Sequence, residues 1–342
     1  MRVGVLYSPF DKLANKEVEQ DLKEMGLSVH DALKGAGYDP LLIDIDKTDF
    51  SRIQELDLDL LFNVCERLHG DCMYEPQIAS LLEMMSVRIT GSSGSTLSVC
   101  NNKIMMKEMA RHHGILTPRS QVLFAPDQVQ QNMLKFPVII KPASMHNSIG
   151  IFKDSLAHDE EDMRKKAARI MYQYRQPALI EEYIPGKDVE VSIMGNSDSM
   201  KTLPPIEVHY PRQKDQSSQF FSYESKWSSN KKESGCYRRA QGIEPKITAK
   251  IVRLARKCYR LYGLRDYGRV DFRLGNDGKV YLLEVNANPG LSPGDSLIVA
   301  GGCDGMTHAK IIIGIFLNAA KRNSLVNGQQ NNQILQKTIT HA

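Results

Sequence analysis

The chain has 342 residues and a mass of 38.5 kDa, which is large enough for two or three packed domains. With 42% hydrophobic and 25% charged residues, its composition is that of an ordinary soluble globular protein. The net charge of +4 is small for this length, and the basic residues are dispersed without a stacking-aromatic motif, which argues against a nucleic-acid-binding protein.

Cysteine spacing and hydropathy narrow the class further. The six cysteines are scattered without a Cys-x-x-Cys pair, a pattern that fits reduced thiols better than a disulfide framework or a zinc site. The first residues, MRVGVLYS, lead straight into a strand and contain no signal-peptide core. No run approaches the roughly 18 apolar residues of a spanning helix. We therefore expect a cytoplasmic protein with no membrane partner.

The first hundred residues alternate predicted strands with predicted helices. Strands are expected at 2–7, 41–45 and 58–64, and helices from the first loop to about residue 34, over 75–85 and after Gly94. Such alternation is typical of a parallel α/β sheet, whose ligands lie at the carboxyl ends of the strands. The loops after Tyr7 and Val64 are therefore candidate site loops. The second contains His69, although a single histidine is more often a structural hydrogen-bonding residue than a catalyst.

The middle of the chain contains a lysine at the end of a predicted buried strand, where an unpaired charge is unfavourable. Residues 137–142, PVIIKP, form a predicted buried strand that ends in Lys141 and leads into a loop at 143–150. A lysine at the end of an apolar strand is unfavourable without an anionic partner, so we expect a phosphate group beside it. Further strands are expected at 120–124, 179–184, 188–194 and 203–210, and helices at 127–134, 247–262 and 309–321.

Two segments are strongly polar. Residues 211–241 are rich in Ser, Lys and Gln, and structureless loops of this length are commonly lids or disordered. Residues 324–342 are polar and rich in Asn and Gln, and we expect them to be disordered.

A hairpin near the end of the chain carries the strongest chemical signal. Two predicted strands, at 269–274 and 279–285, are joined through Asn276-Asp277-Gly278, a strong turn signal. Antiparallel pairing places Asp271 opposite Glu284, with Asn286 on the same face. Two carboxylates and an amide oxygen form the oxygen-only kind of site that Mg²⁺ prefers. The alternative is a surface hairpin with solvated acids.

The same stretch carries a family resemblance. RVDF followed by YLLEVNANPGL resembles the metal-binding end of ATP-grasp ligases, most closely the D-alanine–D-alanine ligase family, and the resemblance extends in order from Met1 to about Arg322. It implies the α/β fold class, α+β in the ATP-grasp part, with a three-domain architecture. The implied parts are an N-terminal parallel α/β domain at 1–97, a central subdomain at 98–185, a C-terminal subdomain with lid and metal site at 186–322, and a disordered tail at 323–342.

The resemblance also implies phosphate and metal contacts. ATP phosphates would meet Lys103, Lys141 and Lys226, the last from the lid, beneath a loop that includes Ser148. One or two Mg²⁺ ions, for which Mn²⁺ is a substitute, would be held by Asp271, Glu284 and Asn286.

The strand at 179–184 would be the hinge that reads adenine. Ile184 would offer its backbone N–H, Tyr183 would cover the base, and Glu181 and Asp188 stand at the positions of acids near the ribose. The alternative is a central-sheet strand with two exposed acids.

The resemblance implies three catalytic residues and one substrate-binding pair. Arg269 would stabilise the oxyanion of a tetrahedral intermediate, and Lys226 would bring a cation as the lid excludes water. His69 would lie near the first amino-acid subsite, while Ser296 and Leu297 match the pair that holds the second substrate's carboxylate.

Three positions depart from the family together. The glutamate, serine and tyrosine that receive the first D-alanine are here Asn15, Asn147 and Trp227. An asparagine cannot give an ammonium group the charge-assisted bond that a carboxylate gives, and Trp227 adds an aromatic face. A shift of loop register would return a carboxylate through Glu17. We expect a donor other than D-alanine and a small amino acid or carboxylate as the second substrate.

The favoured interpretation is an ATP-dependent carboxylate–amine ligase that forms an amide through an acyl phosphate and releases ADP and phosphate. An authentic D-alanine–D-alanine ligase with an unusual pocket is the alternative within this class. A catalytically silent nucleotide-binding protein is the alternative from another class, although all three metal ligands and all three lysines are present. The resemblance further suggests a homodimer.

Overall fold

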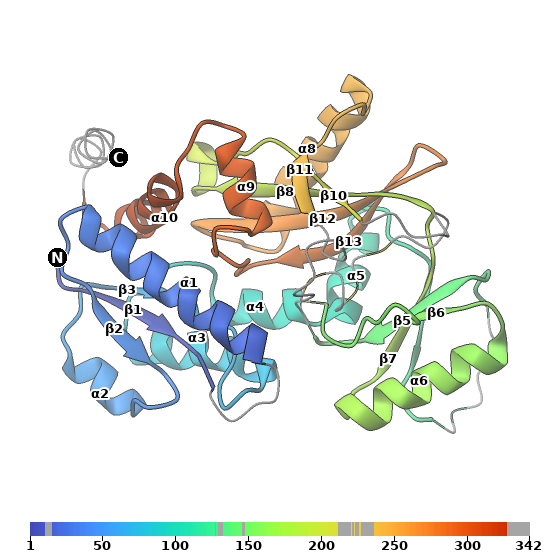
Figure 1. The fold of residues 1–342 in the computed structure, drawn as a ribbon, viewed down its shortest axis with the longest axis horizontal. Coiled ribbons are helices and arrows are strands. Elements are labelled where there is room, and N and C mark those ends of the chain that lie inside the picture. The colour runs from blue at the N-terminus through green and yellow to red at the C-terminus, as the bar shows by residue number, and fades with distance from the viewer. Residues whose placement is uncertain are drawn as a thin grey trace.

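The computed structural model describes residues 1–10, 16–126, 128, 133–145, 148–210, 220, 222, 226 and 236–326. Asn15, Asn147, Trp227, most of the helix predicted at 127–134 and the tail beyond residue 326 lie outside the described residues. The described chain builds three sheets (Figure 1). Each sheet falls inside one of the three domains expected from the sequence, whose boundaries stay a prediction.

The N-terminal sheet has the parallel α/β arrangement that its alternating pattern predicts. Its strand order is β2–β1–β3, from β1 (Val3–Tyr7), β2 (Leu41–Asp44) and β3 (Leu60–Asn63). One face packs against α1 (Lys16–Gly35) and the other against α2 (Phe50–Glu55) and α3 (Glu75–Met84), which follows a short 3-10 turn, η1 (Cys72–Tyr74). The carboxyl ends of β1 and β3 lead into the loops that the sequence singles out.

The single helix predicted after Gly94 is in fact two, because Asn102 interrupts it. Asn102 has an extended backbone with ψ 96°, so α4 (Gly94–Asn101) ends there. Its side-chain oxygen accepts hydrogen bonds of 3.1 Å from the N–H groups of Ile104 and Met105, which caps the start of α5 (Lys103–His112). Lys103 is therefore the first residue of a new helix.

The central sheet is antiparallel, in the order β4–β7–β5–β6. Its strands are β4 (Ser120–Leu123), β5 (Val138–Pro142), β6 (Leu156–Ala157) and β7 (Ala178–Glu182). It is covered by α6 (Glu160–Tyr174), which the sequence analysis missed and which packs into a core of its own with this sheet (Figure 1). Asp159 caps this helix by accepting from the Asp162 N–H at 2.9 Å.

The C-terminal sheet runs in the order β11–β10–β8–β12–β13, with β9 paired to β8. Its strands are β8 (Gly186–Met194), β9 (Lys201–Thr202), β10 (Ile206–His209), β11 (Cys236–Arg239), β12 (Tyr267–Gly275) and β13 (Val280–Asn286), with the 3-10 turn η2 (Ser197–Ser199) between β8 and β9. The remaining helices are α8 (Pro245–Leu261), α9 (Ser296–Gly302) and α10 (His308–Arg322). Strand β11 lies within the segment expected to be a loop, because its residues, CYRR, lack a strand pattern.

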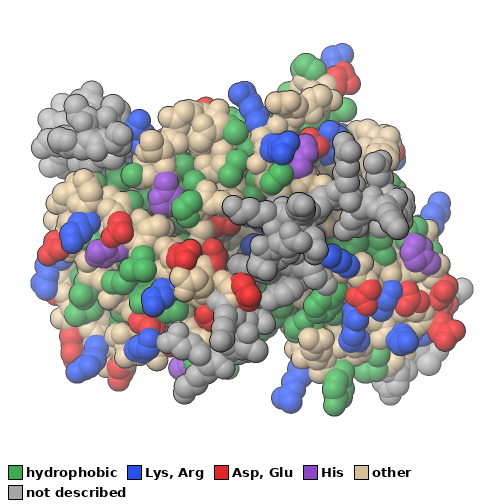
Figure 2. Space-filling model, viewed as in Figure 1, with side chains coloured by type: hydrophobic (Ala, Val, Ile, Leu, Met, Phe, Trp, Pro, Cys, Tyr) green, Lys and Arg blue, Asp and Glu red, His purple; other side chains and the backbone are tan. Residues whose placement is uncertain are grey.

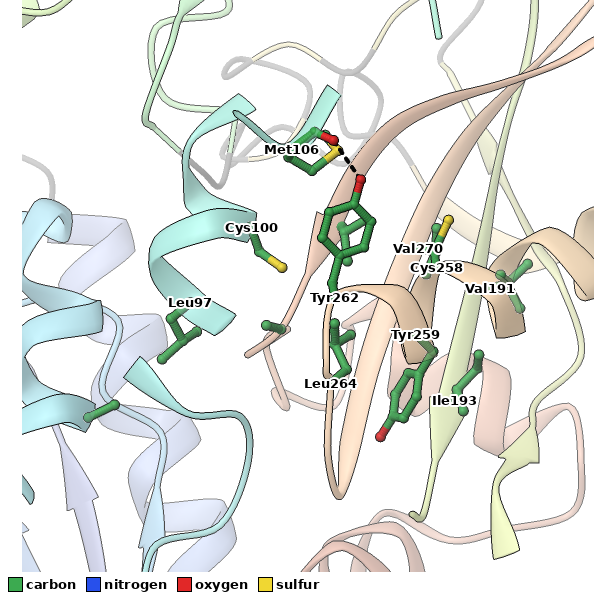
Figure 3. Packing of buried hydrophobic residues seen from close by; sticks show 14 of the residues in the cluster. Leu97, Cys100, Met106, Val191, Ile193, Cys258, Tyr259, Tyr262, Leu264 and Val270 are labelled. Carbon is green, nitrogen blue, oxygen red and sulfur yellow. Dashed lines mark hydrogen bonds between the residues drawn. The ribbon is translucent and has the colours of Figure 1, made fainter. Parts of the chain in front are cut away.

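The N-terminal and C-terminal parts share a continuous apolar core. Figure 3 shows Cys100 and Met106 from the paired helices facing Tyr262, beyond the end of α8, and Val270 of β12 belongs to the same cluster. The Tyr262 hydroxyl donates to the Met106 carbonyl at 2.5 Å, so a buried polar group is satisfied inside this core. The central sheet is thus the one with a separate core.

No helix in the described part of the chain combines the length and apolar character needed to cross a lipid bilayer.

Asp266 ties three distant segments together. Its carboxylate is fully buried and accepts hydrogen bonds from the Gly91 N–H at 2.9 Å, Asn196 Nδ2 at 2.8 Å and Arg322 Nη2 at 2.7 Å. Its backbone lies in the left-handed region with φ 66°. A buried carboxylate is costly unless it is paired, and here each oxygen has charged or amide donors.

We expect Asp266→Asn to lower the free energy of unfolding by about 2 kcal/mol or more, because Arg322 would lose its buried counter-charge. Urea denaturation measures this. The matched control is Asp57→Asn, at another left-handed residue with φ 50° whose ion pair with Arg2 is exposed. That change should cost about 0.5 kcal/mol or less. Equal losses in both variants would contradict the prediction.

Glu75, at the start of α3, is a second buried carboxylate. Its oxygens accept from Asn101 Nδ2 at 2.7 Å and from Asn288 Nδ2 at 2.9 Å, so it connects α3 with α4 and with the loop after β13. Burial raises the pKa of Glu75 to about 8, although the two amide donors oppose the increase.

This shift predicts a pH dependence of stability. Between pH 4.5 and about 8 the unfolded chain releases the Glu75 proton while the folded protein keeps it, so rising pH favours unfolding. The cost is at most about 1.4 kcal/mol per pH unit and levels off above the folded-state pKa. The difference in unfolding free energy between the unmodified protein and Glu75→Gln should therefore change across this range in urea titrations. A difference that is constant with pH would contradict the assignment.

Candidate active site

The β12–β13 hairpin brings the predicted metal ligands together. Asp271 pairs with Glu284 and Arg269 with Asn286 across the two antiparallel strands, which confirms the predicted register at these positions. The pairing shifts by one residue between Asp271 and Phe272, a bulge that the sequence did not predict. The two carboxylates and the amide all lie on the wall of one cavity.

Both carboxylates are already balanced by cations. Asp271 accepts from Arg269 Nε at 2.7 Å and Nη2 at 2.9 Å, and from Asn286 Nδ2 at 2.8 Å. Burial, with the charge of Glu284 adding to it, raises the pKa of Asp271 against the opposing effect of Arg269. Glu284 lies 3.1 Å from Lys103 Nζ, and although burial alone would raise the pKa of Glu284, Lys103 holds it below its usual value.

The opposite wall, from the central sheet and α5, is built on a buried triad. Glu181 on β7 faces Lys107 Nζ at 2.9 Å and also pairs with Lys141. Burial opposes ionisation, yet the two lysines hold the pKa of Glu181 at about 2. Burial lowers the pKa of Lys107 to about 8, against the opposing effect of Glu181. The anionic partner expected beside Lys141 is therefore supplied by the protein, and Glu181 positions a cation.

The segment after β7 is held by Arg273 of β12. Its guanidinium donates to the Ile184 carbonyl, the Tyr183 hydroxyl and Asp188, each at 2.8 Å. The other Asp188 oxygen accepts from the Tyr210 hydroxyl. Within the described residues the Ile184 N–H has no hydrogen-bond acceptor. This donor lies at the cavity, while both Asp188 oxygens are already engaged.

Most of the residues assigned to nucleotide and metal share this cavity between the central and C-terminal sheets. Its wall includes Lys103, Lys141, Ser148, Glu181, Tyr183, Ile184, Asp188, Lys226, Arg269, Asp271, Glu284 and Asn286.

The donor set fits a hard divalent cation. Two carboxylates and one amide oxygen on a single sheet face match Mg²⁺, which usually takes one or two carboxylates and completes its shell with water and phosphate. Among the described residues no group of three or more His, Cys, Asp and Glu side chains could hold a metal, so the set reaches three donors only through Asn286.

His69 is not among the residues of the cavity wall. Leu68 and Asp71 exchange backbone hydrogen bonds of 3.1 and 2.9 Å, so that His69 and Gly70 form the tip of a tight turn with φ values of 51° and 78°. The His69 ring is 66% exposed and its Nδ1 lies 2.9 Å from Asp46. His69 thus lies outside this cavity, and its place near the first amino-acid subsite stays a prediction.

The substrate residues predicted near the ends of the chain likewise lie outside the cavity wall, and their role stays a prediction. Glu17 is exposed on α1, whereas Glu19 turns inward to Arg67 at 2.9 Å. Ser296 begins α9 and is fully buried behind the cavity wall, and Leu297 belongs to the apolar core.

Two acidic residues at the site were missed. Glu190 lines the cavity and lies two residues beyond Asp188 on β8, so the two-residue alternation of the strand could have indicated it. Glu66, in the loop after β3, is buried, and burial raises its pKa to about 7 while Lys226 opposes the increase. Its position in a loop already considered a site loop was the available signal.

On the face drawn in Figure 2, acidic and basic side chains are interspersed and no extended basic patch is visible.

Comparisons with known proteins agree with this geometry. The family model described as "D-ala D-ala ligase C-terminus" matches residues 113–316. The chain is 29% identical over 322 residues to a D-alanine–D-alanine ligase of Bordetella petrii, covering 93% of this chain and 92% of that protein. It is 30% identical over 279 residues to a D-alanine–D-alanine ligase of Francisella philomiragia, covering 81% of this chain and 85% of that protein.

The fold is also that of solved ligases. A crystal structure of a D-alanine–D-alanine ligase from Bacillus anthracis superposes with a TM-score of 0.76 at 21% identity, covering 95% of this chain and 99% of that one. With a matching family model over more than half of its length, the chain belongs to the D-alanine–D-alanine ligase family of ATP-grasp ligases, enzymes that form carbon–nitrogen bonds.

Proposed function

We propose that this protein uses ATP and Mg²⁺ to join a carboxylic acid other than D-alanine to an amine. The observation that carries the proposal is one cavity in which the carboxylate pair Asp271 and Glu284 faces the cations Lys103 and Lys141. Metal ligands on one wall and buried lysines on the other suit a nucleotide triphosphate between them.

Asp271, Glu284 and Asn286 would hold the divalent ion, for which Mn²⁺ is a substitute. When bound, the ion neutralises charge on the phosphate oxygens. Lys103 and Lys141 hold positive charge on the opposite side, with Lys141 fixed in place by Glu181. These positions are set before any nucleotide arrives, so little reorganisation is needed.

The segment after β7 supports the assignment of an adenine site. The Ile184 N–H points to no acceptor among the described residues and is fixed by the Arg273 bond to the neighbouring carbonyl. Such a donor suits a ring nitrogen of the base. Tyr183 is held beside it by Arg273, which lies 5.3 Å from the ring centroid.

The reaction proceeds in two steps. The substrate carboxylate attacks the γ-phosphorus, ADP leaves, and an acyl phosphate forms. The free-base amine then attacks the acyl carbon, the bond from that carbon to the phosphate oxygen breaks, and the departing phosphate takes the surplus proton. Arg269 is placed to balance negative charge developing on the carbonyl oxygen, and Lys226 adds a cation to the cavity.

The choice of donor rests on the three substituted positions, Asn15, Asn147 and Trp227, all outside the described residues. The structure adds that Glu17 is exposed and that Glu19 is engaged by Arg67, so neither of these two α1 carboxylates takes the place of the missing glutamate in the cavity wall. A donor that does not depend on an ammonium–carboxylate bond at Asn15 fits these residues better than D-alanine.

The donor can be identified without knowing the amine. We expect ATP, Mg²⁺ and hydroxylamine to convert the right acid to a hydroxamate, because hydroxylamine captures the acyl phosphate. A panel of amino acids and small carboxylic acids, read by the iron(III) colour of the hydroxamate, should give a response with an acid other than D-alanine. A response with D-alanine above all others would instead support an authentic D-alanine–D-alanine ligase, and none with any acid would overturn the ligase proposal.

Replacing a metal ligand should abolish this activity selectively. Asp271→Asn is expected to lower kcat/KM for hydroxamate formation by about 100-fold or more, because a neutral amide binds a divalent ion far less strongly. The control is Asp277→Asn on the turn of the same hairpin, where the carboxylate is exposed and accepts from Tyr281 at 2.9 Å. That variant should keep its activity. Similar losses in both would show that the hairpin fold, not the ligand, was affected.

A further inference from the structure

Glu190 lies in the middle of the catalytic wall. On β8 it pairs with Asp271 of β12, and Ser192 pairs with Arg269, so these side chains share one face of the sheet. Glu190 is only 6% exposed and lines the cavity. Within the described residues its Oε2 forms no hydrogen bond.

Arg269 is the cation that faces Glu190. Arg269 Nε lies 3.2 Å from Glu190 Oε2 and 2.7 Å from Asp271 Oδ1, so one guanidinium is shared by two carboxylates. Even if a metal ion engaged Asp271, Glu190 would still neutralise Arg269. The positive charge of Arg269, which would bind a substrate carboxylate, is therefore already balanced by carboxylates of the protein.

Ser296 also faces Glu190. Its hydroxyl is buried beside the Glu190 carboxylate and opposes the increase in pKa that burial causes there. Arg269 and Ser296, the groups expected to meet a substrate carboxylate or oxyanion, thus lie around a carboxylate of the chain itself.

Besides Lys226, the other described cations of the cavity wall each face a carboxylate of the chain. In the described cavity wall, Lys103 faces Glu284, Lys141 faces Glu181 and Arg273 faces Asp188. Beyond Ser296 the side chains are again acidic. Burial and the charge of Asp295 raise the pKa of Asp21, and burial with the charges of Asp21 and Asp295 raises the pKa of Glu66 to about 7, while Lys226 opposes both increases. A substrate carboxylate at this place would be repelled by like charges in a buried site, whereas a substrate cation would be attracted.

We propose that the acceptor of this ligase is an amine that carries a hydrogen-bond donor or a positive charge, and no carboxylate, beside its attacking nitrogen, and that Glu190 selects it. The inference rests on the proposed ligase function and names the class of its second substrate. It replaces the expectation of an amino-acid acceptor held at Ser296. The carbon–nitrogen bond is formed and phosphate released as described above, so the chemistry is unchanged.

The test uses the full chain with the donor identified by hydroxamate formation. Acceptors are compared in matched sets: alanine, alaninamide and ethylamine, then lysine, lysinamide and 1,5-diaminopentane. Amide products are measured by mass spectrometry and ADP release gives kcat/KM. In at least one set, the amide or the diamine, which carries the additional donor or positive charge, should exceed the parent amino acid by about tenfold or more.

Variants separate charge from shape. Glu190→Gln keeps the size of the side chain. It should lower the preference for carboxylate-free acceptors over the amino acid by about tenfold or more, because Arg269 loses one of its two counter-charges. Glu190→Asp keeps the charge and should keep the preference, which covers the case in which the glutamine variant folds poorly. Glu207→Gln on β10 is the matched control. Glu207 also forms an ion pair, with Lys187, and it is next to Ile206, the residue that pairs with Glu190 in the sheet.

Each outcome decides the matter. An unmodified enzyme that joins amino acids better than their carboxylate-free counterparts would overturn the inference while leaving the ligase proposal standing. So would a preference that is the same in Glu190→Gln, Glu190→Asp and Glu207→Gln. Hydroxamate formation with no acid would remove the ligase proposal, and this inference with it.

Discussion

Charge balance inside one cavity is the constraint on which the rest of the site depends. Each pair joins different elements: Lys103 of α5 meets Glu284 of β13, and Glu181 of β7 meets Lys107 of α5. An unpaired charge in such a place would cost several kcal/mol, so the elements must come together with their partners in place. The pairs therefore fix the distance between the two walls as well as the charges a nucleotide and a metal ion would meet.

The pattern of the β12–β13 hairpin was readable from the sequence because it is local. Alternation of side chains and the Asn276-Asp277-Gly278 turn set which residues face each other, and Asp271 indeed lies opposite Glu284. The parallel sheet of the first three strands followed from the same kind of short-range signal. Where a residue's surroundings depend on a partner far away in the chain, the sequence could not show them. Lys141 was expected to lie beside a phosphate, which stays a prediction, and the structure shows that Glu181, forty residues later, already pairs with it.

Two other features have the same physical origin. The Leu68–Asp71 bridge leaves the His69 ring exposed, and no property of the histidine itself indicates that turn. Strand β11 has little strand propensity and exists because β10 offers it a free edge. Glu190 differs from both: it was within reach of the alternation argument, since Asp188 had already been placed on that face of β8.

Our two proposals on substrate choice concern separate parts of the chain, which bears on how such a ligase can diverge. The residues on which the donor proposal rests, Asn15, Asn147 and Trp227, are far apart in the sequence, whereas Glu190 is one residue of a sheet strand. A strand residue that points into the cavity can change charge without altering the ladder, because its backbone bonds to β10 and β12 do not involve the side chain. The metal ligands on β12 and β13 need not move when that happens. A different acceptor thus requires no new fold and no new metal site, only a change in the counter-charge of Arg269.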